Sequence, residues 1–217
     1  RAAGTHLPES VGMSALPPLD QPSQQLARLA RRRFDAIVIG ASAGGVEVLL
    51  RLLPALRAGL QAAVFIVVHL PREHESLLPA IFAPRCALPV SEARDKVTPK
   101  PGHVYVAPPD YHLLVDTGPV LALSVDEPVY FSRPSIDVLF EAAADAYGPR
   151  ALGIVLSGGS PDGAAGLACI ALQGGGAVVQ SPQTAAVDTM PLAAIEHCPQ
   201  ALVLSCLLYT SPSPRDS

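Results

Sequence analysis

The sequence predicts an α/β fold, namely a doubly wound, mostly parallel sheet flanked by helices, with an inserted antiparallel β-hairpin. Short continuous apolar runs predict strands that are covered on both faces, as in parallel sheets; they are residues 36–39, 62–68, 151–156, 177–179 and 201–204. Helical patterns separate these runs at 44–56, 75–82, 135–146, 162–172 and 191–196. Strands that alternate with helices indicate right-handed βαβ units and therefore a parallel sheet.

The stretch from residue 97 to residue 130 interrupts this alternation. It contains "HVYVAPPDYHLLVDTGPVLALSVD", in which strand-like runs are joined by Pro-Pro-Asp and Asp-Thr-Gly-Pro turns. Runs joined by such turns are typical of antiparallel hairpins. We therefore expect the inserted hairpin here.

The composition predicts a cytoplasmic globular protein that binds no nucleic acid and does not insert into a membrane. With 49% hydrophobic and 16% charged residues, the chain can bury a full core. The net charge of −4 gives no electrostatic reason to bind nucleic acid, and no apolar run approaches the roughly 20 residues of a membrane-spanning helix. The four cysteines are scattered without a C-x-x-C pair; they are Cys86, Cys169, Cys198 and Cys206. This spacing favours neither a zinc site nor a disulfide framework. Because no signal-peptide pattern is visible either, we expect a reducing compartment.

A glycine-rich turn, in "VIGASAGG", follows the first predicted strand. Dinucleotide-binding turns need G-x-G-x-x-G with a bare second glycine, but the aligned residues here are Gly40, Ser42 and Gly45. The acidic residue expected about 20 residues later is also missing. The same turn reads G-x-S-x-G, the nucleophile elbow that exposes a serine hydroxyl between a strand and a helix. Ser42 is therefore a candidate nucleophile, with a plain helix N-cap as the alternative.

Two further predicted strands deliver polar residues to the same edge of the sheet. His69 closes "AAVFIVVHLP", and Asp162 lies in "SGGSPDG" after strand 151–156. Sites of open α/β sheets form at the carboxyl ends of their strands. Taken singly, a hydrogen-bonded histidine and a helix cap are the simpler interpretations. Together with Ser42, the two residues supply the nucleophile, base and carboxylate of a serine hydrolase, in a chain order that differs from that of α/β-hydrolases.

Six motifs of the chain, spread over residues 35–205, resemble the catalytic domain of CheB, the chemotaxis-receptor protein-glutamate methylesterase. They are "VIGASAGG", "VVHLP", "PGHVYVAPPDYHL", "SRPSIDVLFEAAADAYG", "SGGSPDGAAGL" and "VVQSPQTAAVDTMPLAAI". The resemblance implies hydrolysis of glutamate methyl esters on receptor signalling helices, with release of methanol, and in some members deamidation of receptor glutamines. It implies Ser42 as the nucleophile, His69 as the base and Asp162 as the partner that orients the base. It implies no metal and no organic cofactor.

The chain departs from the family's pattern at two positions of the expected oxyanion hole. Ala43 stands where the family often has threonine, and Gly159 where it often has methionine. Backbone N–H groups remain, so we expect Ala43 and the loop of Gly158, Gly159 and Ser160 to bind the oxyanion, each donor contributing ~3 kcal/mol. The departures, together with the damaged C-terminus expected after Ser205, support one alternative. It is a weakly active or inactive methylesterase-like module that binds receptors or a methyltransferase.

Other motif residues carry weaker predictions. Arg133 in "SRPSID" is a candidate for binding the acidic surface of the substrate, with capping of local structure as the alternative. We expect plain surface roles for His103 and His112. Met190 and Pro191 are expected to begin a helix under the site, since proline suits the first turn.

The two ends of the chain are expected to lie outside the catalytic domain, which we place at residues 34–205. Residues 1–33 are proline-rich and predict a flexible leader or linker, with a short helix at 24–33. The segment "CLLYTSPSPRD" resembles the translation of a transposase adapter used in sequencing libraries. We therefore expect residues 206–217 to be non-native and the natural sequence to continue differently after Ser205.

Overall fold

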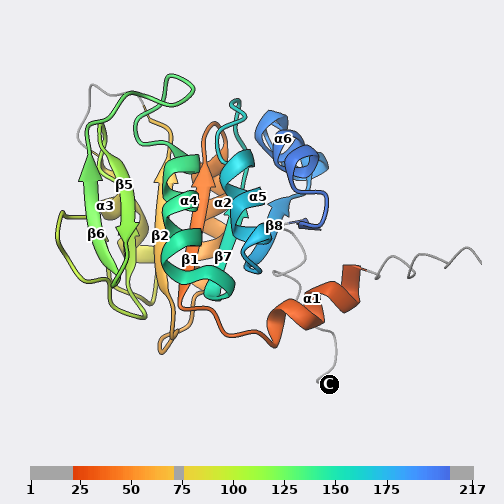
Figure 1. The fold of residues 1–217 in the computed structure, drawn as a ribbon, viewed down its shortest axis with the longest axis horizontal. Helices are drawn as coiled ribbons and strands as arrows, with labels where there is room; N and C mark the ends of the chain where they lie inside the picture. The colour runs from red at the N-terminus through yellow and green to blue at the C-terminus, as the bar shows by residue number, and fades with distance from the viewer. Residues whose placement is uncertain (1–21, 71–75, 206–217) are drawn as a thin grey trace, which may run out of the picture.

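A seven-stranded parallel sheet lies at the centre of the protein, with helices on both faces (Figure 1). The structure is a computed structural model that describes residues 22–70 and 76–205. The strands follow the order β3-β4-β2-β1-β7-β8-β9, and all neighbours are parallel. They are β1 (Ala36–Ala41), β2 (Ala63–Val68), β3 (Val90–Glu92), β4 (Val104–Val106), β7 (Ala151–Val155), β8 (Gly176–Gln180) and β9 (Leu202–Leu204). The predicted fold class is confirmed.

The structure corrects the prediction for one part of the expected insertion. The "HVYV" run was expected in the antiparallel hairpin, but it forms β4, which pairs in parallel with β2. All three residues of β4 are buried, and a strand buried in this way belongs inside a covered parallel sheet. β3, at the edge beyond β4, was not predicted. It is a three-residue strand that includes Glu92, and short charged strands are usual at sheet edges.

The rest of the insertion is the expected hairpin. β5 (His112–Asp116) and β6 (Val120–Ser124) form a separate antiparallel pair, joined at the predicted Asp-Thr-Gly-Pro turn. Gly118 in this turn has φ 92°, which glycine adopts without steric cost. Leu113, Val115 and Leu121 point from the hairpin into the main core. The hairpin therefore packs against the sheet's helical layer as part of the same body.

Helices cover both faces of the sheet, and those predicted are present. One face carries α4, α5 and α6, and the other carries α2 and α3 (Figure 1). Proline at position 54 ends the predicted 44–56 helix early, in a 3₁₀ turn at Leu53–Ala55. Among the described residues, no helix is long and apolar enough to cross a membrane. The bounds are α1 (Pro22–Ala30), α2 (Gly45–Leu52), α3 (Leu78–Phe82), α4 (Ile136–Tyr147), α5 (Ala164–Leu172) and α6 (Thr189–His197).

Parts of three predicted segments lie outside the described residues. They are residue 75 of the predicted 75–82 helix, residues 1–21 of the predicted leader and the predicted tail at 206–217. The leader helix expected at 24–33 is observed as α1, two residues earlier in the chain.

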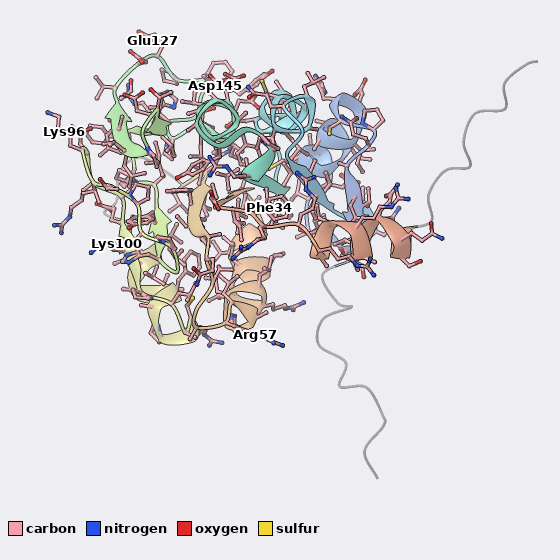
Figure 2. The ribbon with its side chains drawn as sticks, turned by 60° about the horizontal axis from the view of Figure 1, so that its bottom comes forward. Phe34, Arg57, Lys96, Lys100, Glu127 and Asp145 are labelled. Carbon is pink, nitrogen blue, oxygen red and sulfur yellow. The ribbon has the colours of Figure 1, made fainter. Side chains whose placement is uncertain are left out.

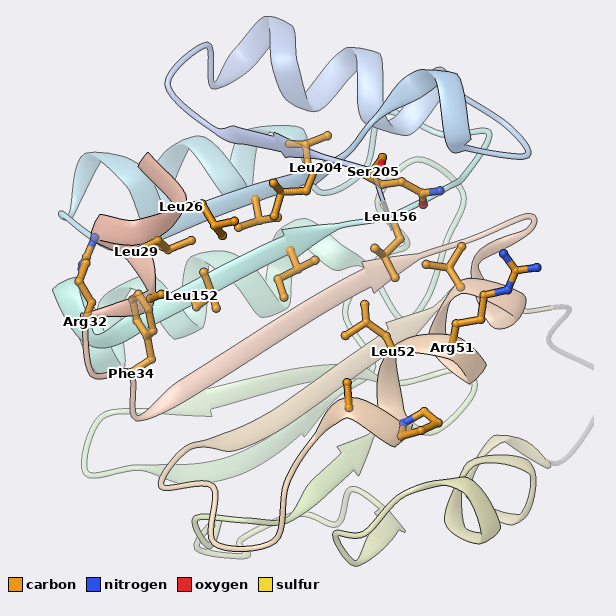
Figure 3. A pocket seen from close by; sticks show the side chains of 18 residues that line it. Leu26, Leu29, Arg32, Phe34, Arg51, Leu52, Leu152, Leu156, Leu204 and Ser205 are labelled. Carbon is orange, nitrogen blue, oxygen red and sulfur yellow. The ribbon is translucent and has the colours of Figure 1, made fainter. Parts of the chain in front are cut away.

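An apolar groove of about 600 Å³ lies on the α2 face of the sheet, over β7, β8 and β9 (Figure 3). Leu26 and Leu29 of α1 form one side of it, and Leu52 of α2 contributes to the other. Leu152 of β7 and Leu156, which directly follows this strand, line its floor. α1 therefore extends the helical layer of this face only in part.

Candidate active site

Three loops at the carboxyl edge of the sheet bring the candidate residues together. Ser42 follows β1, His69 follows β2, and Asp162 lies in the loop between β7 and α5. The chain builds the sheet outward from β1 on one side and then returns to β7 on the other, so β1 and β7 flank the point where strand order reverses. Ligand sites of open α/β sheets form at this point.

The Ser42 turn packs tightly against the loop that follows β7. The Ser42 N–H donates to the carbonyl of Ser157 (2.9 Å), and the Gly45 N–H donates to the Ser42 carbonyl (2.8 Å). A Cβ atom on Gly158 would lie 2.8 Å from the Cβ of Ser42 and 2.6 Å from Met190 Cε. A side chain at position 158 would therefore displace Ser42 or Met190. Met190 lies in the first turn of α6, where the predicted helix under the site begins.

His69 forms a hydrogen bond to Asp162 that joins two of the three predicted residues. Its Nε2 lies 2.8 Å from Asp162 Oδ2, and the side chains are 10% and 0% exposed. The His69 N–H donates to the Ala41 carbonyl at 3.0 Å, which places the histidine backbone beside the end of β1 and next to Ser42. Among the described residues, no hydrogen bond joins the Ser42 hydroxyl to His69. Because Nε2 faces Asp162, Nδ1 is the ring nitrogen that remains for the serine proton.

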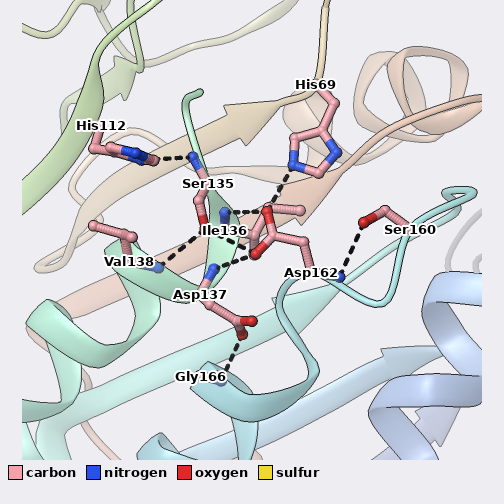
Figure 4. Close-up of polar contacts among 9 residues, drawn as sticks. All are labelled: His69, His112, Ser135, Ile136, Asp137, Val138, Ser160, Asp162 and Gly166. Carbon is pink, nitrogen blue, oxygen red and sulfur yellow. Dashed lines mark hydrogen bonds and ion pairs between the residues drawn. The ribbon is translucent and has the colours of Figure 1, made fainter. Parts of the chain in front are cut away.

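Asp162 is held at the N-terminus of α4 by donors only (Figure 4). Besides His69, its Oδ2 accepts from the N–H of Ile136 (2.7 Å), and its Oδ1 accepts from the Ser135 hydroxyl (2.8 Å) and the N–H of Asp137 (2.9 Å). Burial alone would raise the pKa of Asp162, but hydrogen bonds from His69 and the amides of Asp137 and Ile136 outweigh it and lower the pKa. The positive end of α4 favours the same charge. Asp162 is therefore an ionised carboxylate directed at His69.

Asp137 is a second buried carboxylate, one helical position from Ile136. Its Oδ1 accepts the N–H of Gly166 at 2.7 Å, so it links the first turns of α4 and α5. Burial raises the pKa of Asp137 to about 6, and the nearby Asp162 charge acts in the same direction, against the hydrogen bond from Gly166. Of the two neighbouring carboxyl groups, Asp137 therefore takes up a proton first as the pH falls, and Asp162 keeps its charge.

Two residues of this network were not assigned to the site from the sequence. Ser135 is the N-cap of α4, and its hydroxyl donates to Asp162. The plain surface role expected for His112 is wrong, because this side chain is 1% exposed. His112 Nδ1 accepts the Ser135 N–H (3.1 Å), and its Nε2 bonds the Glu127 carbonyl (3.1 Å). His103, half-buried, bonds the hydroxyl of Ser91.

The backbone N–H groups expected to bind the oxyanion differ in whether they already donate to another residue. The Gly158 N–H donates to the Val187 carbonyl at 3.0 Å and is therefore occupied. Gly159 is exposed, and the nearest side-chain atom to a Cβ placed there is Val187 Cγ1 at 3.8 Å. The Ser160 hydroxyl accepts the Asp162 N–H at 3.2 Å and so helps to shape the loop. Ala43, which follows Ser42, and Gly159 therefore stay the predicted oxyanion donors.

The Arg133 guanidinium forms hydrogen bonds with neighbouring loops. Its Nη2 donates to Asp110 Oδ1 at 2.8 Å, and its Nη1 donates to the carbonyls of Val125 (2.7 Å) and Asp126 (3.1 Å). These contacts are those of the local cap that was the alternative prediction. Since the guanidinium is used in this way, substrate binding by Arg133 has no support in its geometry.

Among the described residues, no group of three or more His, Cys, Asp or Glu side chains is arranged to hold a metal ion. Cys86, Cys169 and Cys198 are free thiols.

The fold is an α/β sheet that brings Ser42, His69 and Asp162 to the switch point of its strand order, and the three side chains are of the types that serine hydrolases use. Comparison with known proteins identifies the family. The family model described as CheB methylesterase matches residues 37–207. The chain belongs to the CheB methylesterase family.

Relatives and a solved structure agree with this assignment. A provisionally named protein-glutamate methylesterase/protein-glutamine glutaminase of Leptospira interrogans is 43% identical over 172 residues, covering 79% of this chain and 89% of the relative. The corresponding protein 1 of Rhodospirillum rubrum is 38% identical, covering 88% of this chain and 51% of the relative. The catalytic domain of Thermotoga maritima CheB methylesterase superposes with a TM-score of 0.76 at 30% identity, covering 81% of this chain and 94% of the domain.

Proposed function

We propose that this chain is a serine esterase that hydrolyses glutamate methyl esters on the signalling helices of chemotaxis-type receptors. The observation that carries the proposal is the hydrogen bond between His69 and the buried, ionised Asp162, beside the turn that presents Ser42. Such a pair orients the imidazole and stabilises its protonated form when it takes a serine proton. Family membership supplies the substrate, because the relatives are named for methylesterase and glutaminase activity.

The reaction proceeds in two halves. Ser42 Oγ attacks the ester carbonyl while His69 takes its proton at Nδ1, and the N–H groups of Ala43 and Gly159 stabilise the oxyanion. The tetrahedral intermediate expels the methoxy group, which leaves as methanol with the proton from His69. Water then attacks the acyl-enzyme and gives one proton to His69. His69 returns this proton to Ser42 Oγ as the acyl–oxygen bond breaks, and the released glutamic acid side chain ionises to the carboxylate.

Glutamine deamidation is a second proposed activity of the same site, since the names of the relatives include it. Ser42 would attack the side-chain amide, and ammonia would leave in place of methanol. The non-catalytic module is not favoured, because binding alone does not require the Asp162–His69 pair. A methyltransferase partner remains a prediction.

A methylated receptor signalling fragment, alone and with its modified glutamates replaced by glutamines, tests the proposal. We expect this chain to release methanol from the ester and, if deamidation occurs, ammonia from the glutamine form. A chain that is folded by circular dichroism, binds the fragment and releases neither product would overturn the proposal in favour of the binding module.

A further inference from the structure

The exposed aromatic side chains of the described residues all lie in two loops. Tyr111 (42% exposed) follows β4, whereas Tyr130 (53%) and Phe131 (97%) lie between β6 and α4. We call these three residues the aromatic rim. The loop between β6 and α4 stands above the edge at which the parallel strands end (Figure 1), and Glu127 marks its outer part (Figure 2). Tyrosine and other aromatic residues are enriched where proteins bind partners.

The two loops are held as one unit. Arg133 Nε and Nη2 both donate to Asp110 Oδ1, at 3.1 and 2.8 Å, and the Asp110 N–H donates to the Arg133 carbonyl at 3.2 Å. Within the second loop, Val129 and Ser132 exchange both backbone hydrogen bonds, at 3.1 and 2.8 Å. The aromatic rim is therefore a fixed surface whose backbone is set by Arg133.

The backbone of the rim is strained in a way that burial does not offset. Tyr130 has φ 46° and Phe131 has φ 61°, the left-handed region that costs residues with a Cβ. A bulky residue rarely adopts it, and two in succession persist only where the surroundings enforce it. Both side chains are nevertheless exposed. Strained, exposed and clamped residues of this kind indicate a binding role.

The rim lies within a short reach of the catalytic residues. Phe131 and Ser135 are four positions apart in the chain, so their Cα atoms are at most about 14 Å apart, and the Ser135 hydroxyl donates to Asp162. Leu70, 38% exposed and directly after His69, adds apolar surface on the catalytic side. Two turns of an α-helix span about 11 Å. A bound helix therefore covers a distance of this order within two to three turns of its modified glutamate.

We propose that the aromatic rim is the docking surface for the helix that carries the substrate glutamate, through apolar side chains one or two turns from that residue on the same face. The inference rests on the proposed function and names the contact that positions its substrate. A helix whose face carries only charged residues would gain nothing from this surface.

Steady-state methanol release from two substrates tests the inference. One is the helical receptor fragment, and the other is N-acetylglutamate side-chain methyl ester, which is too short to reach the rim. We expect Phe131→Ala to lower kcat/KM for the fragment at least about tenfold, mostly through KM, since a buried phenyl ring contributes this much to binding. For the N-acetylglutamate side-chain methyl ester, we expect Phe131→Ala to lower kcat/KM by less than about twofold. Leu172→Ala, an 82% exposed leucine at the end of α5, is the matched control.

The outcomes separate the two proposals. Equal kcat/KM values of Phe131→Ala and Leu172→Ala on the receptor fragment would overturn the proposed docking surface and leave the proposed esterase activity intact. An equal loss on both substrates would also overturn it, because the ring would then act on the catalytic residues. Absence of methanol release by the unaltered chain from either substrate would overturn both proposals. A second fragment carries lysine in place of the apolar residues one or two turns from the modified glutamate. With the unaltered chain, kcat/KM for this fragment should be lower by the same factor of about ten. Phe131→Ala should then lower kcat/KM for this fragment no further.

Discussion

Asp162→Asn changes the one group on which the proposed catalytic arrangement depends. The carboxylate accepts four hydrogen bonds, from His69, Ser135, Ile136 and Asp137. An asparagine offers one acceptor oxygen and places an NH₂ group where the other oxygen was. In either orientation one backbone N–H, that of Ile136 or that of Asp137, loses its acceptor.

The expected magnitudes follow from that count. One buried N–H without a partner costs about 1–3 kcal/mol, and replacing the charged acceptor weakens the remaining bonds, so we expect a loss of about 3–5 kcal/mol in the free energy of unfolding. Catalysis suffers more. With the NH₂ toward His69, Nε2 becomes the acceptor and the ring proton moves to Nδ1, where the serine proton must go. With the opposite orientation, the imidazolium lacks its counter-charge. We expect kcat to fall about 10⁴-fold, as for the equivalent change in other serine hydrolases.

The assay combines methanol release at saturating substrate with urea unfolding. Asp145→Asn is the control, since Asp145 lies exposed on the same helix, α4. A folded Asp162→Asn variant whose kcat stays within about tenfold of the unaltered chain would refute the role of the His69–Asp162 pair.

Three further predictions concern the surroundings of the site. Asp137, with its pKa raised to about 6 from 3.8, favours the folded state below pH 4 and loses that contribution as the pH rises through 6. Unfolding measured across this range should therefore show the unaltered chain losing on the order of 3 kcal/mol relative to Asp137→Asn, and parallel curves would contradict the shift. Ser135→Ala removes a hydroxyl that bonds Asp162 and caps α4, so urea unfolding should show a loss of about 2–4 kcal/mol, against less than about 0.5 for the more exposed Ser124→Ala. Phe131→Gly relieves the left-handed backbone at φ 61° without removing a buried side chain, so its melting temperature should exceed that of Phe131→Ala; the reverse order would show that the backbone there is not strained.

Much of the fold could be predicted because its strands are continuous apolar runs. β1 and β2 are covered on both faces, and their sequences show it directly. β3 and β4 were missed as members of the sheet for a different reason. Each has three residues, and whether such short runs join a hairpin or a parallel sheet depends on a partner elsewhere in the chain, which is β2 for β4 and β4 for β3. Local sequence carries no signal for that pairing.

The candidate residues could be predicted because each follows a strand of the parallel sheet. Their supporting network could not, since the contacts of Asp162 with Ser135 and of Ser135 with His112 join residues 27 and 23 positions apart. One signal for Ser135 was present. A serine directly before a helical pattern is an N-cap, and a crossover helix after a parallel strand begins at the carboxyl edge, where its free N–H groups meet the site. His112 lacked such a signal, because a histidine that begins a hairpin strand is as often exposed as buried.

Methanol release by Ser42→Ala tests the central claim most directly. The variant keeps the backbone contacts of the turn with Ser157 and Gly45, so circular dichroism should match the unaltered chain, and Ser91→Ala, on β3, is the control for a lost hydroxyl. We predict that kcat falls by at least about 10³-fold, with residual turnover from the oxyanion donors and substrate binding alone. Release at an undiminished rate from folded Ser42→Ala would show that another group attacks the ester, and the proposed mechanism would be wrong.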